Sequence, residues 1–172
     1  MDVPSLLPQA SADPSADNLA AAESAVRKYC GWHIAPVVIE DIVLDGTGTA
    51  SLFVKSLRLV NVAAAAVDGV ALDVSTLEWS EAGFLRTSGC WPDRLRSVRL
   101  TIEHGFDEVP DVAAIIRAIA ARADASPTGA VREQVGAVSA SNSLTAPGVS
   151  GGVVLMDHER KMLDQYKVGV RL

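Results

Sequence analysis

The chain has 172 residues, 15 of them basic and 21 acidic, which gives a formal net charge of −6. This length favours one domain of ordinary size with its own core. The acidic balance argues against a protein that binds nucleic acid through its phosphates, because such binding requires a surplus of Lys and Arg. Cys30 and Cys90 are too few for a disulfide framework or a four-ligand zinc site, so we interpret them as free, buried thiols in a reducing compartment.

Membrane and export signals are weak along the whole sequence. No apolar run approaches the roughly 20 residues that a bilayer-crossing helix requires. The N-terminus shows neither the charged segment nor the apolar segment of a signal peptide. We therefore expect a soluble protein made inside a cell. Residues 1–16 are rich in Pro, Ser, Ala and Asp without an apolar period, which predicts a flexible N-terminal tail.

The first regular element is a helix over 17–30. Asp17 is a candidate N-cap, and apolar residues then recur at helical spacing as far as Cys30. Gly31 follows directly and can adopt the left-handed conformation that ends helices. Such a short helix is marginal in water by itself, so we expect it to pack against another element.

The apolar period then changes to two, which predicts a series of antiparallel β-hairpins. The expected strand pairs are 38–44 with 50–54, 62–67 with 70–72, and 78–79 with 84–86. Asp68-Gly69 between the second pair is a strong hairpin signal, because both residues tolerate positive φ. A last strand runs from Val98 to Ile102, and its alternation with polar residues predicts one solvent-facing side.

Helical spacing returns after Pro110, which suits the first turn of a helix. We predict a helix over 110–125 with one apolar stripe, with Arg117, Arg122 and Asp124 facing away from that stripe. Residues 126–152 are dominated by small and polar residues, which predicts a flexible arm with a weak strand signal at 131–140. Asp157 is a candidate cap for a last helix within 153–172. The fold class is therefore α+β, with a core domain over 17–125.

Catalytic and metal-binding patterns are weak. His33, His104 and His158 are scattered and form no metal-binding pair. Cys30 falls at the C-terminal end of its helix, where the helix dipole raises a thiol pKa. We therefore expect no enzyme activity, no cofactor and no metal. The alternative is a small enzyme whose site combines Cys30, His33 and His104.

A local excess of positive charge is carried by Arg86, Arg94, Arg96 and Arg99. One interpretation is a surface that contacts acidic partner residues or passing phosphates. The other, which we favour, is a solvated strand face beside a loop.

Short motifs in a fixed order give the sequence its most specific signal. The series comprises Tyr29-Cys30-Gly31-Trp32-His33-Ile34-Ala35-Pro36, Leu44-Asp45-Gly46, Ser56-Leu57-Arg58-Leu59, Val67-Asp68-Gly69-Val70, Glu78-Trp79, Gly83-Phe84-Leu85-Arg86, Trp91-Pro92, His104-Gly105-Phe106 and Val109-Pro110. In this order the motifs resemble the head-to-tail adaptor proteins of tailed actinobacteriophages, which are related to the gp6-like head-tail connectors. The resemblance covers 17–125 well and the C-terminal segment more loosely.

The resemblance implies a gp6-like connector fold with a small helical body and a structural role in the virion neck, after synthesis in the host cytoplasm. About a dozen copies would form a ring below the portal protein and extend the DNA channel towards a downstream neck or tail protein. Genomic DNA would pass through without sequence-specific binding, and no membrane would be involved. We expect the helix over 111–125 and the sheet to form the ring body through head-to-tail contacts.

The C-terminal segment is the expected docking element for the portal or a neighbouring copy. Its candidate contact residues are Val153, Leu155, Met156, Arg160, Met162, Leu163 and Tyr166. Residues 131–140 are a candidate edge strand for addition to a neighbour. A different neck or tail-completion protein is the second alternative to the adaptor.

Overall fold

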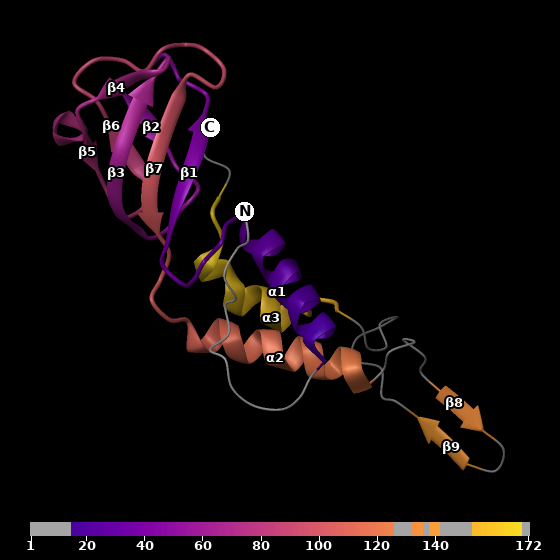
Figure 1. The fold of residues 1–172 in the computed structure, drawn as a ribbon. Coiled ribbons are helices and arrows are strands. Elements are labelled where there is room, and N and C mark those ends of the chain that lie inside the picture. The colour runs from indigo at the N-terminus through magenta and orange to yellow at the C-terminus, as the bar shows by residue number, and fades with distance from the viewer. Residues whose placement is uncertain (1–14, 126–131, 136–137, 142–152, 170–172) are drawn as a thin grey trace. The chain divides into compact units, whose positions relative to one another are not determined.

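The computed structural model describes residues 15–125, 132–135, 138–141 and 153–169 (Figure 1). These residues belong to two compact units. The strand unit comprises Gly31–Glu108 with residues 168–169, and the helical unit comprises residues 15–30 with the described part of Val109–Lys167. Helices and antiparallel sheets together confirm the predicted α+β class. Length alone favoured one domain, whereas the predicted core over 17–125 contributes to both units.

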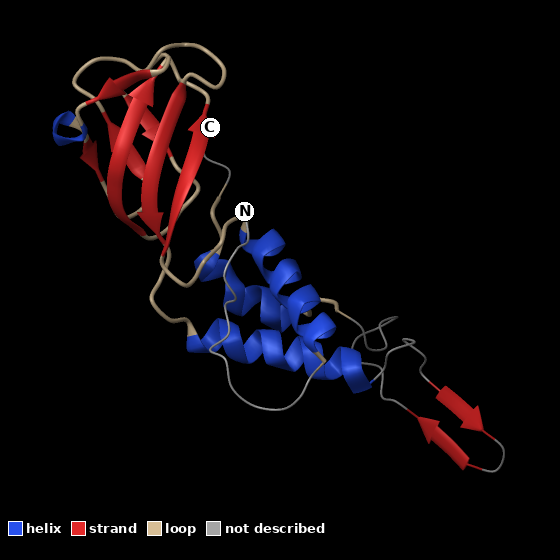
Figure 2. Cartoon of the chain, in the orientation of Figure 1, coloured by secondary structure: helices blue, strands red, loops and turns tan. Residues whose placement is uncertain are grey.

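The strand unit contains two antiparallel sheets (Figure 2). The four-stranded sheet has the order β1 (Val38–Leu44), β7 (Val98–His104), β3 (Leu59–Val67) and β4 (Val70–Leu72). The three-stranded sheet has the order β2 (Ser51–Phe53), β6 (Phe84–Arg86) and β5 (Glu78–Trp79), and a short 3-10 helix, η1 (Val74–Thr76), precedes β5.

A single apolar core joins the two sheets. Leu100 and Ile102 of β7 face Leu52 and Leu85 of the three-stranded sheet, and Trp91 from the loop before β7 completes the cluster. All five side chains are buried. Buried and more exposed residues alternate along β7, which confirms the predicted strand with one solvent-facing side.

Two of the three predicted hairpins are confirmed. Strands β3 and β4 pair across Asp68 and Gly69, whose φ angles are +50° and +83°. Both angles lie in the left-handed region, as a tight hairpin turn requires. Strands β5 and β6 pair as well.

The predicted hairpin between 38–44 and 50–54 is wrong, because β1 pairs with β7 and β2 pairs with β6. The turn that was expected to join them is held by another loop instead. The amide of Gly46 donates a 2.8 Å hydrogen bond to the carbonyl of Arg94. A Cβ on Gly46 would lie only 1.9 Å from the carbonyl oxygen of Pro92, so this close approach requires glycine.

The helical unit contains α1 (Ala16–Cys30), α2 (Pro110–Ala125) and α3 (Asp157–Leu163), and α3 continues into the 3-10 helix η2 (Asp164–Tyr166). Helix α1 packs against α2 and α3. The predicted apolar stripe of α2 is confirmed as buried and comprises Val112, Ile115, Ile116, Ile119, Ala120 and Ala123. Leu163 of α3 is also fully buried.

The helix ends agree with the sequence in part. Gly31 follows α1 with φ +82°, which confirms it as the residue after the helix end. Asp17 is not the N-cap, because α1 already begins at Ala16 and places Asp17 in the first turn. In α3 the N-cap is Met156 rather than Asp157, which is the first helical residue.

Part of the predicted arm forms a small hairpin of β8 (Arg132–Val135) and β9 (Val138–Ser141), which pair with each other (Figure 1). The weak strand signal at 131–140 therefore corresponds to a local hairpin. The rest of the predicted arm, and the predicted N-terminal tail as far as residue 14, lie outside the described residues.

Candidate functional site

Two segments that carry the family resemblance meet at one end of the strand unit, where the start of β1 pairs with the end of β7. The indole ring of Trp32 lies 6.2 Å from the ring of His104 and 5.8 Å from the ring of Phe106, measured between centroids. The amide of Phe106 donates a 2.8 Å hydrogen bond to the carbonyl of Ile34. These motifs, more than 60 residues apart in sequence, form one packed cluster.

The backbone around this cluster adopts uncommon conformations. Ile34 has φ +72°, which is strained for a β-branched residue, and its side chain is fully buried. The imidazole of His33 donates from Nε2 to the carbonyl of Pro36. Gly105 also has a positive φ, and a Cβ there would lie 2.5 Å from the Pro36 carbonyl oxygen. The Trp32–Pro36 motif is thus specified by packing and turn geometry.

His104 is the most buried titratable residue of this cluster. Its side chain is 4% exposed, and Nε2 lies 3.1 Å from a carboxylate oxygen of Glu40. Burial lowers the pKa of His104, and the Glu40 carboxylate opposes this shift only in part. The imidazole is therefore neutral at pH 7 and donates its Nε2–H to Glu40. The ring of His33 lies 5.3 Å away, so the two histidines are neighbours.

The candidate site of the enzyme alternative is divided by the structure. His33 and His104 belong to the strand unit, whereas Cys30 belongs to the helical unit. The Sγ atom of Cys30 lies 3.9 Å from the carbonyl oxygen of Leu163, and the side chain is fully buried. The prediction of buried thiols is therefore confirmed for Cys30 and wrong for Cys90, which is exposed. Burial raises the pKa of Cys30 to about 11, so the thiolate that a nucleophile requires is scarce at neutral pH.

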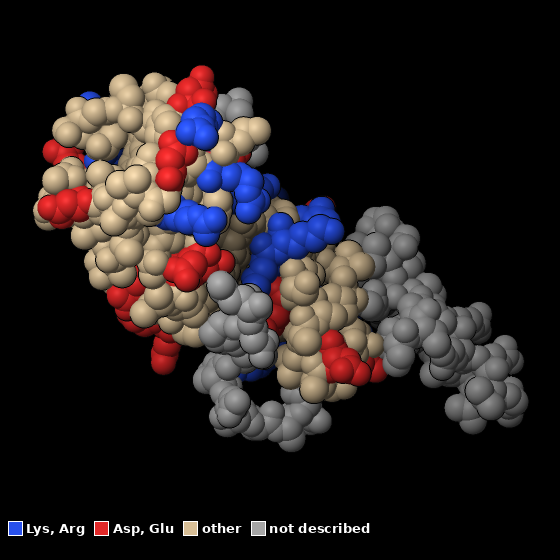
Figure 3. All heavy atoms as spheres, turned by 45° about the horizontal axis from the view of Figure 1, so that its top comes forward, with Lys and Arg blue, Asp and Glu red and all other residues tan. Residues whose placement is uncertain are grey.

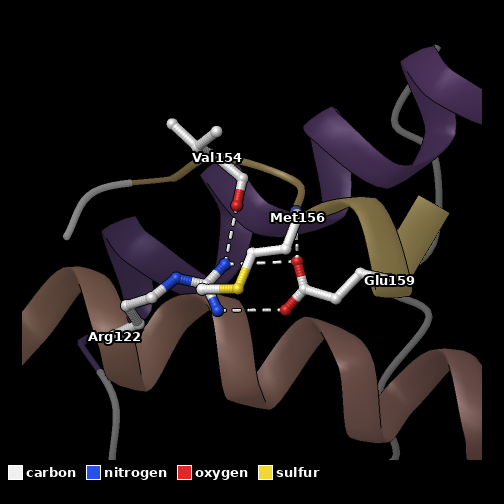
Figure 4. A network of polar contacts seen from close by, with 4 residues as sticks. All are labelled: Arg122, Val154, Met156 and Glu159. Carbon is white, nitrogen blue, oxygen red and sulfur yellow. Dashed lines mark hydrogen bonds and ion pairs between the residues drawn. The ribbon is translucent and has the colours of Figure 1, made fainter. Parts of the chain in front are cut away.

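A network of polar contacts fastens the C-terminal segment to α2 (Figure 4). Arg122 binds the carboxylate of Glu159 with both terminal nitrogens, at 3.0 and 3.2 Å, and also donates to the carbonyl of Val154 at 2.6 Å. The same carboxylate accepts a 2.8 Å hydrogen bond from the amide of Met156 at the start of α3. The side chains of Arg122 and Glu159 are 15% and 4% exposed. We call these four residues the C-terminal clasp.

The clasp was not predicted from the sequence. Arg122 was expected to face away from the apolar stripe, yet its guanidinium is largely buried against the C-terminal segment. Asp124 was also expected to face away from the apolar stripe. Its carboxylate accepts hydrogen bonds from the Ser15 hydroxyl and the Asn18 side-chain amide. A local signal for the clasp does exist, since Glu159 occupies the third position of α3, where a carboxylate reaches the N-cap amide.

The predicted docking residues of the C-terminal segment fall into three groups. Leu163 is fully buried, and the Tyr166 hydroxyl donates to the Asp111 carboxylate at 2.8 Å. Burial and this carboxylate raise the pKa of Tyr166 to about 12. Met162 is 49% exposed and Arg160 is also exposed, so both face away from the helical unit. The remaining three, Val153, Leu155 and Met156, are half-buried.

The four arginines of the predicted basic cluster are spread over different parts of the strand unit. Arg86 follows the core residue Leu85 on β6, so it lies on the outer face of the three-stranded sheet. Arg99 lies on the outer face of the four-stranded sheet, between two core residues of β7. Arg94 and Arg96 belong to the loop between these strands.

Carboxylates contact both loop arginines, one through its side chain and the other through its backbone amide. Arg94 forms a 3.0 Å ion pair with Asp68, and the amide of Arg96 donates a 2.7 Å hydrogen bond to the Asp45 carboxylate. Figure 3 shows basic and acidic side chains next to one another over the strand unit. The local surface is therefore mixed in charge.

The outer face of the four-stranded sheet contains an open hollow of about 370 Å³. Its position follows from the strand register, which places Val43, Arg99, Ala66 and Ala71 in one row across the sheet. The next row on that face contains Asp41, Thr101 and Ala64. The alanines of β3 and β4 are much shorter than Val43 and Arg99, so this part of the face is recessed. We call it the alanine hollow.

The outer face of the three-stranded sheet carries two neighbouring aromatic side chains. Phe53 and Phe84 are register partners on β2 and β6, and their rings lie 5.3 Å apart between centroids. Both point away from the core, because their neighbours Leu52 and Leu85 point into it. Phe84 remains 41% exposed. We call these two residues the phenylalanine pair.

Comparisons with known proteins add no family to these observations: no family model and no curated protein matches the chain.

Within the described ranges, no three His, Cys, Asp or Glu side chains are grouped closely enough to hold a metal ion. The helices of those same ranges are all too short or too polar to span a membrane. The candidate functional features are therefore the two outer faces of the strand unit and the exposed side of α3.

Proposed function

We propose that this chain is a structural virion protein, a head-to-tail adaptor. Its copies form a ring below the portal protein, extend the DNA channel and provide a platform for the tail or the next neck protein. The ordered motifs of the sequence support this proposal through their resemblance to such adaptors. The contacts of Trp32, Ile34, His104 and Phe106 fit it, because each of these residues serves packing or backbone geometry.

The observation that carries the proposal is the exposed apolar surface of the strand unit. Ile39 is 70% exposed and Val43 is 37% exposed on the four-stranded sheet, and Phe84 is 41% exposed on the other sheet. Apolar side chains that stay exposed on both outer faces are suited to contacts with other proteins. A protein that works by assembly requires such surfaces on more than one side, because each copy contacts a neighbour on either hand.

The net charge of −6 fits a protein that surrounds passing DNA. Tight binding to DNA is driven by Lys and Arg side chains that displace counterions from the phosphates. An acidic chain lacks that driving force, so DNA passes by without being retained.

Portal binding is assigned to the exposed side of α3, around Met162 and Arg160. Leu163 and Tyr166 hold α3 and η2 in the helical unit, so they support this surface from within. Removing the whole segment 153–172 would also remove buried residues, and a substitution on the exposed side therefore tests portal binding more cleanly.

The test is co-purification of the full chain with assembled portal rings. We expect the wild-type chain to bind, and we expect Met162→Glu to weaken binding because a charge replaces an apolar contact. Leu95→Glu is the matched control, since Leu95 is an 82% exposed apolar residue of the strand unit. A wild-type chain that does not bind portal rings, or virions whose neck lacks the protein, would contradict the proposed function.

A further inference from the structure

We propose that neighbouring copies contact each other through the strand unit, with the phenylalanine pair of one copy seated in the alanine hollow of the next. This inference rests on the proposed function and names the contact that builds the ring. It involves two surfaces that a single copy carries on opposite outer faces of its two sheets.

The size of the alanine hollow fits the phenylalanine pair. An apolar cavity of about 150 Å³ holds one benzene ring, so a hollow of about 370 Å³ has room for two phenyl rings. The methyl groups of Ala64, Ala66 and Ala71 offer an apolar surface to such rings. The rings of Phe53 and Phe84 already contact each other at an interplanar angle of 54°, so seating them requires little further ordering of side chains.

The charges beside the two surfaces are also complementary. Asp41 and Arg99 line the alanine hollow. Glu78 and Arg86 are register partners on the outer face that carries the phenylalanine pair. Each surface therefore presents one acidic and one basic group, so Arg86 can pair with Asp41 of the neighbour while Glu78 pairs with its Arg99. Such pairs set the orientation of the contact more than its strength.

The geometry makes this contact heterologous, because each copy uses one surface on one side and a different surface on the other. Heterologous contacts form rings when the rotation between copies closes, and filaments when it does not. A symmetric pair of copies would instead use the same surface twice and would stop at a dimer. The proposed contact therefore accounts for a ring with a single repeated interface.

The test measures the association of the full-length chain by sedimentation velocity over a range of concentrations. Phe84→Ala removes half of the phenylalanine pair, and Ala64→Trp fills the alanine hollow. We expect each substitution to raise the concentration of half-association at least about tenfold. Leu95→Ala and Ala114→Trp are the matched controls, because Leu95 lies in a loop and Ala114 is an exposed alanine of α2. Both controls should associate like the wild type.

Mixing the two variants distinguishes this contact from a symmetric one. The Phe84→Ala chain keeps an intact alanine hollow, and the Ala64→Trp chain keeps an intact phenylalanine pair. An equimolar mixture should therefore form one contact per pair of chains and stop at a heterodimer. Either variant alone should stay monomeric at the same concentration. Circular dichroism should show wild-type folding for both, and if Phe84→Ala fails to fold, Phe53→Ala replaces it in the same mixture.

Three outcomes would overturn the inference: a wild-type chain that stays monomeric at every concentration, variants that associate as well as the wild type, or a mixture that forms no heterodimer. The second and third outcomes leave the proposed function in place if the chain still binds portal rings. Loss of portal binding by the wild type would instead overturn the proposed function itself.

Discussion

Individual side chains in this protein stabilise the fold by linking one element to another. The Arg122–Glu159 pair is the strongest example, because two charges with exposures of 15% and 4% share two hydrogen bonds. A buried ion pair contributes little more than well-packed apolar residues would. Removing one partner is far more costly, since the other charge is then left buried without compensation.

We therefore expect Arg122→Met to lower the free energy of unfolding by about 3–5 kcal/mol. Urea denaturation followed by circular dichroism measures this change. Arg117→Met is the matched control on the exposed side of the same helix, and it should change stability by no more than about 0.5 kcal/mol. The double variant Arg122→Met/Glu159→Met should recover most of the loss. Equal effects of Arg122→Met and Arg117→Met would contradict the role of the clasp.

His104 makes the stability of the strand unit depend on pH. Its pKa in the folded protein is lowered by burial, so protonation favours the unfolded state. Stability should be full above about pH 6.5, the ordinary histidine value, and should fall as the pH drops below it. The loss should level off once the pH passes the folded-state pKa.

The measurement is the urea midpoint of the wild type and of His104→Gln between pH 8 and pH 5. The difference between the two chains isolates His104 from the other titrating groups. We expect the wild type to lose more stability than His104→Gln over this interval. Parallel curves for both chains would show that His104 does not titrate differently on unfolding.

Sequence reasoning was weakest at this scale. Arg122 was placed on the solvent-facing side of α2. Its partner Glu159 lies 37 residues further along the chain, so a local pattern could not reveal the contact. Helical periodicity reports only which side of a helix is apolar. It cannot show that a second segment covers the polar side. Leu163 was taken for a docking contact for the same reason, since an apolar residue looks alike whether its partner is internal or external.

At the scale of elements, turn glycines distinguish two physical requirements. Gly69 and Gly83 have nearly equal φ angles of +83° and +81°. A Cβ on Gly69 would meet no atom within 4 Å, whereas a Cβ on Gly83 would lie 2.4 Å from the carbonyl oxygen of Val54. Both positions need the left-handed conformation, and only Gly83 also needs the missing side chain for space.

Gly69→Ala should therefore cost about 1–2 kcal/mol, the strain of a left-handed non-glycine residue. Gly83→Ala should cost at least about 2 kcal/mol more, because the Val54 carbonyl has to move. Thermal unfolding of the two variants measures the difference, with Gly69→Ala as the matched control for backbone strain. Similar midpoints for both variants would show that the β5–β6 turn accommodates a side chain.

Elements with local signals were predicted well. Helix α2 and the hairpins β3–β4 and β5–β6 are specified by periodicity and turn residues within short windows. The partner of β1 was not predictable in this way, because β7 lies more than 50 residues further along the chain. A nearby segment with strand character was therefore taken as its partner. The two outer faces of the strand unit depend on this pairing. The alanine hollow could therefore not be predicted from the sequence either.

At the scale of the molecule, the described part of the chain passes between the two units three times, near residues 30, 108 and 167. The strand unit nevertheless comes almost entirely from one continuous stretch, Gly31–Glu108. Its core of Leu52, Leu85, Leu100 and Ile102 lies within that stretch. The boundaries predicted from composition follow changes in residue type and do not separate these units.

We expect the fragment 31–108 to fold without the rest of the chain. Its urea unfolding should be cooperative, with a smaller m-value than that of the full chain because less surface is exposed. Val98→Ala, a fully buried substitution in β7, should abolish or strongly weaken the transition and serves as the control for a specific core. A fragment without a cooperative transition would show that the strand unit requires the helical unit.

The pairing of Val38 with His104 has a kinetic consequence. Helices α1 and α2 are separated by the whole stretch 31–108, so their encounter in an unfolded chain requires closure of a long loop. A folded strand unit holds Val38 and His104 next to each other. Only 31–38 and 104–108 then remain as the connection between the two helices. This connection is shortened about sixfold, which lowers the entropic cost of bringing the helices together by about 1.5 kcal/mol. Assembly of the helical unit should therefore be fastest when the sheets have already formed.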